Sequence, residues 1–152
     1  MQRRTLVRAS LLLGATAAAT ARAQTDHSHH DHGAPAPAAP KGQPAPAGFV
    51  SAYQACVAAA NACIAHCQVL LAQGDKSLGA CLRTALDTEL TCGATLRAAT
   101  LQSAYLGALA KTSVAAMQAC IEACKPHAEH HAECKRCHDA CVAAVQAANA
   151  LG

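Results

Sequence analysis

Aromatic residues are almost absent from this chain of 152 residues, which has no Trp, one Phe and two Tyr. β-Branched residues are also scarce, and because strands favour both kinds of side chain, the composition disfavours a β-sheet protein. Charged residues make up only 14% of the chain, which excludes a disordered protein rich in charge. The formal net charge of +3 is small, so no basic surface for nucleic acid is predicted.

Proline is missing from most of the chain as well, since only Pro126 follows Phe49. Alanine is abundant instead, with 41 residues, and together with leucine and glutamine it favours helix throughout this region. An alanine side chain buries only a methyl group, so any hydrophobic core is thin. The length suits one ordinary domain.

The first residues, 1–23, have the pattern of an export signal peptide. Arg3 and Arg4 give a basic start, residues 9–20 are mildly apolar, and residues 21–23 fit the small-x-small cleavage rule. The apolar run is shorter than the roughly 20 residues that a membrane span needs, so no membrane span is predicted. The paired arginines resemble a twin-arginine signal, which exports folded proteins, and they predict a periplasmic location. The ordinary secretory route is the alternative.

Residues 24–47 have the composition of a disordered tether rich in His, Pro and Ala. Four histidines lie within residues 27–32, and five prolines lie between residues 35 and 46. Prolines at this density prevent a helix and favour an extended, solvated chain. The histidines either bind a metal loosely or form a polar, solubilising leader.

The remaining residues, 48–152, are predicted to form an all-α domain, an antiparallel up-down four-helix bundle with short connections. Gly74 and Pro126 mark two of the three breaks between helices, whereas the break after residue 100 has neither Gly nor Pro. The predicted helices span residues 48–73, 77–100, 103–125 and 129–150.

Ten cysteines, with nine histidines beside them, are the most unusual feature of the composition. Because a helix turns about 100° per residue, spacings of 3, 4, 7 and 11 keep side chains on one face. The cysteines of each predicted helix follow such spacings and the polar residues lie elsewhere, so the sequence predicts a cysteine-lined core. These cysteines are Cys56, Cys63, Cys67, Cys81, Cys92, Cys120, Cys124, Cys134, Cys137 and Cys141.

Three interpretations of these stripes are open. Buried cysteine can act as a small hydrophobe, but it packs no better than the leucine it would replace ten times. An exported protein can hold disulfides, but cysteines at i and i+4 have Cβ atoms about 5–6 Å apart, whereas a disulfide needs about 3.8 Å. Such bridges would have to cross between helices. The third interpretation, a thiolate store for metal ions, is the one the pattern favours.

The metal that best suits this pattern is Cu(I). Soft thiolates select Cu(I) first, with Zn(II) and iron–sulfur clusters behind it. A zinc site usually has four converging ligands and C-x2-C knuckles on loops; only Cys134 and Cys137 have that spacing, and they lie inside a predicted helix. Cu(I) needs only two or three sulfur ligands, so the cysteine stripes of the helices predict several Cu(I) ions per chain. No nucleophile or base constellation is visible, which favours storage over an enzyme.

The closing half of the chain resembles the four-helix-bundle copper storage proteins. Residues 120–124 (CIEAC), His127 and residues 133–141 (ECKRCHDAC) match that family's C-x-x-x-C helix, His-bearing turn and C-x-x-C-x-x-x-C helix. The runs at residues 56–67 and 80–83 continue the resemblance, which covers residues 50–145.

This resemblance implies a homo-oligomeric bundle, tetrameric in the family, whose core cysteines hold many Cu(I) ions and whose open end carries His or Met. It also implies that exported members supply copper enzymes as recipients, although detoxification would use the same bundle. Residues 142–145 are Val and Ala, where the family often has further cysteines, so a smaller copper capacity is expected here.

Two histidines, His127 and His131, are carried over from the family as candidate copper ligands at the open end. The alternative is that they only form a solvated turn between two helices. His66 and His138 are predicted at seams between helices, and Met117 in the core.

The thiols are expected to be concentrated near the same turn, because the last two helices hold five of them there. Cys56 of the first predicted helix and Cys92 of the second are expected toward the opposite end of the bundle. The expected dense cluster is Cys67, Cys81, Cys120, Cys124, Cys134, Cys137 and Cys141.

Overall fold

A computed structural model describes residue 38 and residues 40–151. The described chain contains four α-helices and two one-turn 3-10 helices. They are α1 (Phe49–Ala72), η1 (Lys76–Leu78), α2 (Gly79–Thr100), α3 (Leu106–Cys124), η2 (Lys125–His127) and α4 (Ala132–Asn149). The predicted all-α class is confirmed. The predicted export signal and most of the predicted tether lie outside the described residues.

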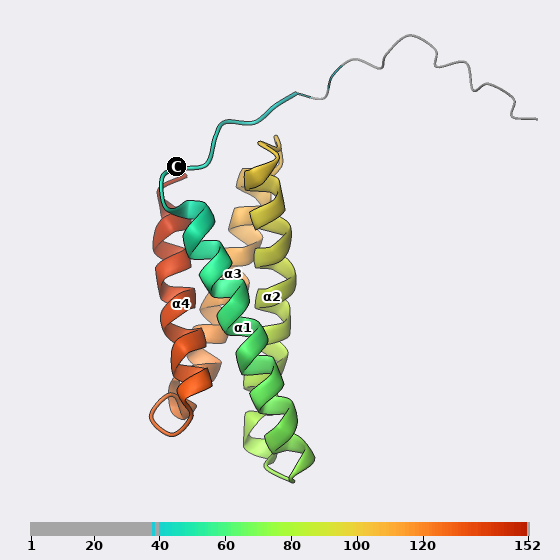
Figure 1. The fold of residues 1–152 in the computed structure, drawn as a ribbon, viewed down its shortest axis with the longest axis vertical. Coiled ribbons are helices and arrows are strands. Elements are labelled where there is room, and N and C mark those ends of the chain that lie inside the picture. Colours follow the sequence, from blue (N-terminus) through green and yellow to red (C-terminus); the bar gives the residue numbers. More distant parts are fainter. Residues whose placement is uncertain (1–37, 39, 152) are drawn as a thin grey trace, which may run out of the picture. The chain divides into compact units, whose positions relative to one another are not determined.

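The four helices form an antiparallel bundle. Helices that follow one another in the chain pack side by side, and α4 also packs against α1 (Figure 1). The α1–α2 and α3–α4 turns lie at one end, which we call the histidine end because it holds His127 and His131. The α2–α3 turn lies at the other end, which we call the far end (Figure 1). The predicted up-down topology is confirmed.

The turns explain where the helices begin and end. After α1, Gly74 has a φ of 98°, the left-handed conformation that glycine adopts at a helix C-terminus. After α2, Gln102 takes the same role with a φ of 52°, and the backbone N–H of Ser103 donates to the carbonyl of Ala98 at 2.9 Å. Because neither glycine nor proline marks this turn, the sequence does not show where the next helix begins. α3 begins at Leu106, later than the predicted residue 103. α4 also begins later than predicted.

The core is lined by sulfur toward the histidine end and by aromatic, methyl and hydroxyl groups toward the far end. Phe49 and Tyr53 are fully buried and their rings stack, with centroids 4.3 Å apart. The hydroxyl groups of Tyr53 and Ser113 share a hydrogen bond of 2.8 Å inside the core. The two largest core side chains therefore close the end of the bundle where cysteines are absent, and Met117 lies in the core as predicted.

Replacing Tyr53 by Phe should lower the free energy of unfolding by about 1 kcal/mol, the net contribution of one hydrogen bond. The cost stays small because the Ser113 hydroxyl still donates to the carbonyl of Ala110 at 2.9 Å. Thermal denaturation followed by circular dichroism measures the change. Tyr105→Phe is the matched control, since Tyr105 is 74% exposed. Equal effects of the two substitutions would contradict a specific role for the buried hydroxyl.

The segment before α1 contacts the far end of the bundle. The backbone N–H of Gly42 donates to the carbonyl of Gln102 at 2.7 Å, and Lys41 forms an isolated bridge with Ser103. A Cβ atom on Gly42 would lie 2.4 Å from the carbonyl oxygen of Ser103, so this close approach requires glycine. The last residues of the predicted tether thus lie against the α2–α3 turn.

By length and composition, α1 is the one described helix that could cross a membrane, with a mean hydropathy of 1.7. Here one of its faces lines the core with Tyr53, Cys56 and Cys63, while its outer face is mostly alanine. A core helix of an alanine-rich bundle has this composition without any membrane.

Candidate metal centre

All ten cysteines lie in the four α-helices, and every one of them has a relative exposure of 0%. The polar residues Gln54, Asn61 and Gln68 of α1 are exposed. The predicted cysteine stripe of each helix therefore faces the axis of the bundle. The reason is the helical period, which keeps the thiols on one face and the polar groups on another.

The sulfur atoms form one connected network along the core. Eight pairs of Sγ atoms are 3.1 to 3.9 Å apart. The Sγ atoms of Cys120, Cys137 and Cys141 all lie within 4.8 Å of one another, and they join the two ends of the network. The network runs from Cys67 near the histidine end to Cys92 beyond the middle of the bundle.

These contacts cross every interface between neighbouring helices. They are Cys63–Cys81 at 3.5 Å and Cys56–Cys92 at 3.9 Å between α1 and α2, Cys81–Cys124 at 3.1 Å between α2 and α3, Cys120–Cys137 at 3.6 Å between α3 and α4, and Cys56–Cys141 at 3.7 Å between α1 and α4. A metal ion shared by any of these pairs would join two helices.

Three groups of sulfurs are compact enough to hold a metal ion. A thiolate–zinc bond is about 2.3 Å long, so two sulfurs on one such ion lie at most about 4.6 Å apart. In each group the Sγ atoms all lie within 4.8 Å of one another, so small side-chain adjustments bring them within this limit. The groups are Cys63, Cys67, Cys81 and Cys134; Cys63, Cys124 and Cys137; and Cys120, Cys137 and Cys141.

The arrangement differs from the expected cluster of seven thiols in two ways. Cys63 was not expected in the cluster, yet it belongs to two of the three groups. Cys56 and Cys92 were expected to lie apart, yet the Sγ of Cys56 is 3.7 Å from that of Cys141. The cause is the rise of the helices, since one helical turn separates layers of thiols by only about 5.4 Å. The expected dense cluster is therefore part of a continuous column.

None of the ten cysteines is paired in a disulfide, and all of them lie in the described part of the chain. The shortest distance between two Sγ atoms is 3.1 Å, from Cys81 to Cys124, whereas a disulfide bond is about 2.0 Å long. The disulfide-stabilised scaffold that the sequence left open is therefore not the state of this bundle.

The thiols fall into two classes, those whose pKa is lowered and those whose pKa is raised, and the causes are hydrogen bonds between thiols, burial and neighbouring charge. Hydrogen bonds with Cys141 and Cys92 lower the pKa of Cys56 to about 4, whereas burial, with the nearby charge of Cys63, raises the pKa of Cys67 to about 12. The pKa is also lowered for Cys63, Cys120, Cys134 and Cys137, and raised for Cys81, Cys92, Cys124 and Cys141. Because metal ligands must be thiolates, an arriving cation displaces the protons of the thiols whose pKa is raised.

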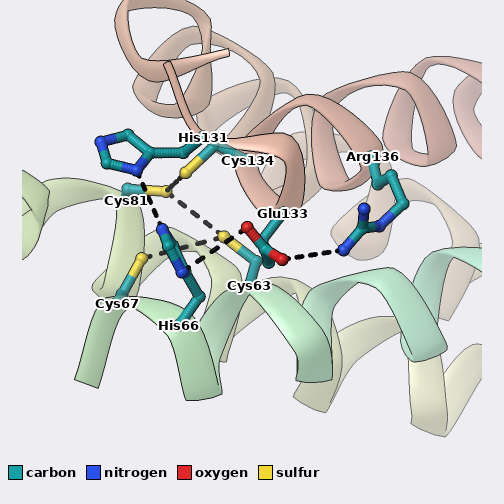
Figure 2. A network of polar contacts seen from close by, with 8 residues as sticks. All are labelled: Cys63, His66, Cys67, Cys81, His131, Glu133, Cys134 and Arg136. Carbon is teal, nitrogen blue, oxygen red and sulfur yellow. Dashed lines mark hydrogen bonds and ion pairs between the residues drawn. The ribbon is translucent and has the colours of Figure 1, made fainter. Parts of the chain in front are cut away.

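The histidine end has a polar cluster beside the outermost sulfurs (Figure 2). His66 lies at the seam between α1 and α4, as predicted, where it shares a hydrogen bond of 3.0 Å with His131. The other ring nitrogen of His66 is 3.5 Å from a carboxylate oxygen of Glu133, which also pairs with Arg136 at 3.1 Å. The ring centroid of His127 is 6.2 Å from that of His131.

The sequence missed two members of this polar cluster, His66 as a contact of His131 and Glu133 as its ion-pair acceptor. The signal that points to them is position, since His66 precedes Cys67 and Glu133 precedes Cys134 directly. His138 instead pairs with Asp139 of its own helix, at 3.0 Å. Among the described residues, no histidine belongs to the compact ligand groups, which are all cysteine.

A continuous column of buried thiols with free Sγ atoms can hold soft metal ions one after another along the bundle axis. The family model of copper storage proteins matches residues 44–151, which includes all four helices and all ten cysteines. A comparison with curated protein sequences finds no match. The match covers well over half of the chain, and its description agrees with the chemistry of the core. This protein belongs to the copper storage protein family.

Proposed function

We propose that this bundle stores copper as several Cu(I) ions per chain, held by the ten core cysteines. The observation that supports it best is the single connected network of buried sulfurs. Cu(I) accepts two or three thiolates, and two of the three compact groups offer three sulfurs. Every sulfur except that of Cys92 lies within 4.8 Å of at least two others, so thiolates can bridge successive ions.

Anaerobic titration of the reduced protein with Cu(I) tests this proposal. We expect uptake of several ions per chain, up to roughly one per cysteine, with thiolate-to-copper absorption in the ultraviolet, because only soft thiolates bind Cu(I) in this way. Saturation at one ion per chain would contradict storage and favour a carrier with a single site. Copper binding without the thiolate absorption would place the ions on nitrogen ligands instead.

A non-enzymatic role is part of the same proposal. It is supported by the burial of the ten thiols and by the family, which is one of storage proteins. The bound ions would be surrounded by sulfur and by the side chains of four packed helices. The stored copper would serve either supply to copper enzymes or detoxification.

We further propose that copper enters at the histidine end, where His127 and His131 act as transient ligands. Both side chains are half-buried beside the outermost thiols, and a neutral imidazole binds copper competently. The far end is closed by the stacked rings of Phe49 and Tyr53. An ion held first by nitrogen would then pass inward to thiolates, which bind Cu(I) more tightly.

Replacing His127 and His131 together by Ala should slow Cu(I) loading severalfold while the final capacity stays nearly unchanged. Stopped-flow absorption at the thiolate-to-copper band measures the rate, and a chelator titration measures the capacity. His138→Ala is the matched control, since His138 is also half-buried but pairs with Asp139 of its own helix. Loading of the double variant at the unaltered rate would show that ions enter elsewhere.

The location and assembly of the protein are also proposals. The pattern of residues 1–23 supports export to the periplasm by the twin-arginine route, which would deliver the bundle folded. The family resemblance supports a homotetramer. Cell fractionation with and without Arg3→Lys and Arg4→Lys tests the export route, and light scattering of the purified protein tests the assembly.

A further inference from the structure

We infer that four of the core cysteines form a closed tetrahedral site for one divalent ion, Zn(II), when the bundle holds no copper. This site goes beyond the proposed storage of Cu(I), because it needs a different coordination number and a different charge. It is the only compact group of four sulfurs among the described residues, namely Cys63, Cys67, Cys81 and Cys134.

The distances between these sulfurs fit a tetrahedral zinc site. Four thiolates at about 2.3 Å from a central ion lie about 3.8 Å apart along each edge of the tetrahedron. The Sγ of Cys63 is 3.9 Å from that of Cys67 and 3.5 Å from that of Cys81. The Sγ of Cys81 is 3.8 Å from that of Cys134. The remaining edges are no longer than 4.8 Å, so side-chain adjustments alone would bring all four sulfurs onto one ion.

The backbone holds these four ligands in place from three helices. Cys63 and Cys67 come from successive turns of α1, Cys81 from the first turn of α2, and Cys134 from the first turn of α4. All four side chains are fully buried, which excludes water as a ligand and makes the site closed in the manner of structural zinc sites. The two other compact groups offer only three sulfurs, which suits Cu(I) better than Zn(II).

The surroundings of the site suit an anionic complex. One Zn(II) ion with four thiolates has a net charge of −2, which needs hydrogen-bond donors or cations nearby. His66 and His131 lie at the same end of the bundle, beside these thiols, and their ring N–H groups can donate, while the carboxylate of Glu133 is already paired with His66 and Arg136 (Figure 2). The sequence disfavoured zinc because only Cys134 and Cys137 have the C-x2-C spacing, and they lie inside a helix. In this site Cys134 contributes without Cys137, and the other three ligands come from α1 and α2.

Zinc and a full load of copper exclude each other. Cys63 also belongs to the group with Cys124 and Cys137, and the Sγ of Cys81 lies 3.1 Å from that of Cys124. A zinc ion bound by Cys63, Cys67, Cys81 and Cys134 therefore removes four of the ten sulfurs from the copper network. Because soft thiolates prefer Cu(I), incoming Cu(I) should release the zinc.

The test is a titration of the reduced, copper-free full chain with Co(II), a spectroscopic substitute for Zn(II), followed by displacement with Zn(II). We expect one Co(II) per chain, with thiolate charge-transfer absorption and the visible bands of tetrahedral cobalt. X-ray absorption of the zinc form should show four sulfurs at about 2.3 Å. Cys67→Ser and Cys134→Ser should each weaken zinc binding at least about 100-fold, the upper limit for loss of an outer-shell group. Cys92→Ser, which removes a thiol outside the site, should lower the copper capacity but leave the cobalt spectrum intact.

Two results would overturn the inference. Cobalt or zinc bound without sulfur ligands would assign it to nitrogen groups, such as the histidines at residues 27–32. Equal weakening by Cys67→Ser and Cys92→Ser would mean that divalent ions bind diffusely along the network. The X-ray measurement uses the unaltered protein, so it decides the issue even where a variant fails to fold. Because the cobalt, zinc and X-ray measurements involve no copper, their failure leaves the storage of Cu(I) untouched, and the copper titration tests that separately.

Discussion

Loading the reduced bundle with Cu(I) should raise its melting temperature by roughly 20 °C or more. The copper-free core is thin, since it is built mainly from cysteine and alanine with only two aromatic rings. Any ion that binds the folded bundle and not the unfolded chain stabilises it by mass action, by about 4 kcal/mol for one site at 1,000 times its dissociation constant. In a domain of about 100 residues each kcal/mol raises the melting temperature by about 4 °C or more, and several ions add together.

The geometry adds a reason specific to this core. Sulfur contacts cross all four interfaces between neighbouring helices, so bridging ions would tie every helix to two others. Circular dichroism at 222 nm as a function of temperature, with and without Cu(I), measures the shift. The copper-free protein should already be helical, because its composition favours helix and Phe49, Tyr53, Leu78 and Met117 pack in the core beside the thiols, unlike the interior of a zinc finger. A strong Cu(I) chelator is the control and should return the melting temperature to its original value.

An unchanged melting temperature at copper saturation would contradict binding in the core. It would place the ions on groups outside the bundle, where they cannot stabilise the fold. An unfolded copper-free protein would contradict a different step, the assumption that the alanine-rich packing is sufficient by itself. The two outcomes are distinguished by the spectrum taken before any copper is added.

The faces of the helices were predictable from the sequence, and their relative heights were not. The helical period alone places Cys56, Cys63 and Cys67 on one face of α1. It does not say which turn of α1 lies level with which turn of α4. That register depends on how the side chains of the two helices interlock, and it decides that Cys56 meets Cys141 at 3.7 Å.

The polar cluster of the histidine end could not be predicted from the sequence either, because it also depends on the register between α1 and α4. His66 and His131 are 65 residues apart in the chain, and only the packing of α1 against α4 brings their rings together.

The end of α2 illustrates a different limit of prediction from sequence. Gln102 adopts a left-handed conformation that glycine normally supplies, so the local sequence gives no signal for the turn. Gly74, which does give one, was predicted correctly.

The register also predicts that thiols are unequal in their contribution to copper capacity. Replacing both Cys81 and Cys124 by Ser should lower the number of bound Cu(I) ions by roughly half, although it removes only two of the ten thiols. These two Sγ atoms are the closest pair in the network, at 3.1 Å. Between them they also contact sulfurs of α1, α3 and α4. Without this pair, two of the three compact groups lose a sulfur, and only the pair Cys63 and Cys137, within 4.8 Å of each other, still links the thiols on either side.

The matched variant replaces Cys56 and Cys92, which form the end of the network farther from the histidine end. Their Sγ atoms are 3.9 Å apart, and the only other thiol contact of the pair is that of Cys56 with Cys141. We expect this variant to lose only about a fifth of its copper, in proportion to the thiols removed, because only Cys141 loses a neighbour and it still lies within 4.8 Å of Cys120 and Cys137. Chelator titration of both variants and thiol counting measure the difference. Equal losses would mean that each thiol binds copper independently, and that the contacts between helices carry no cooperative share of the capacity.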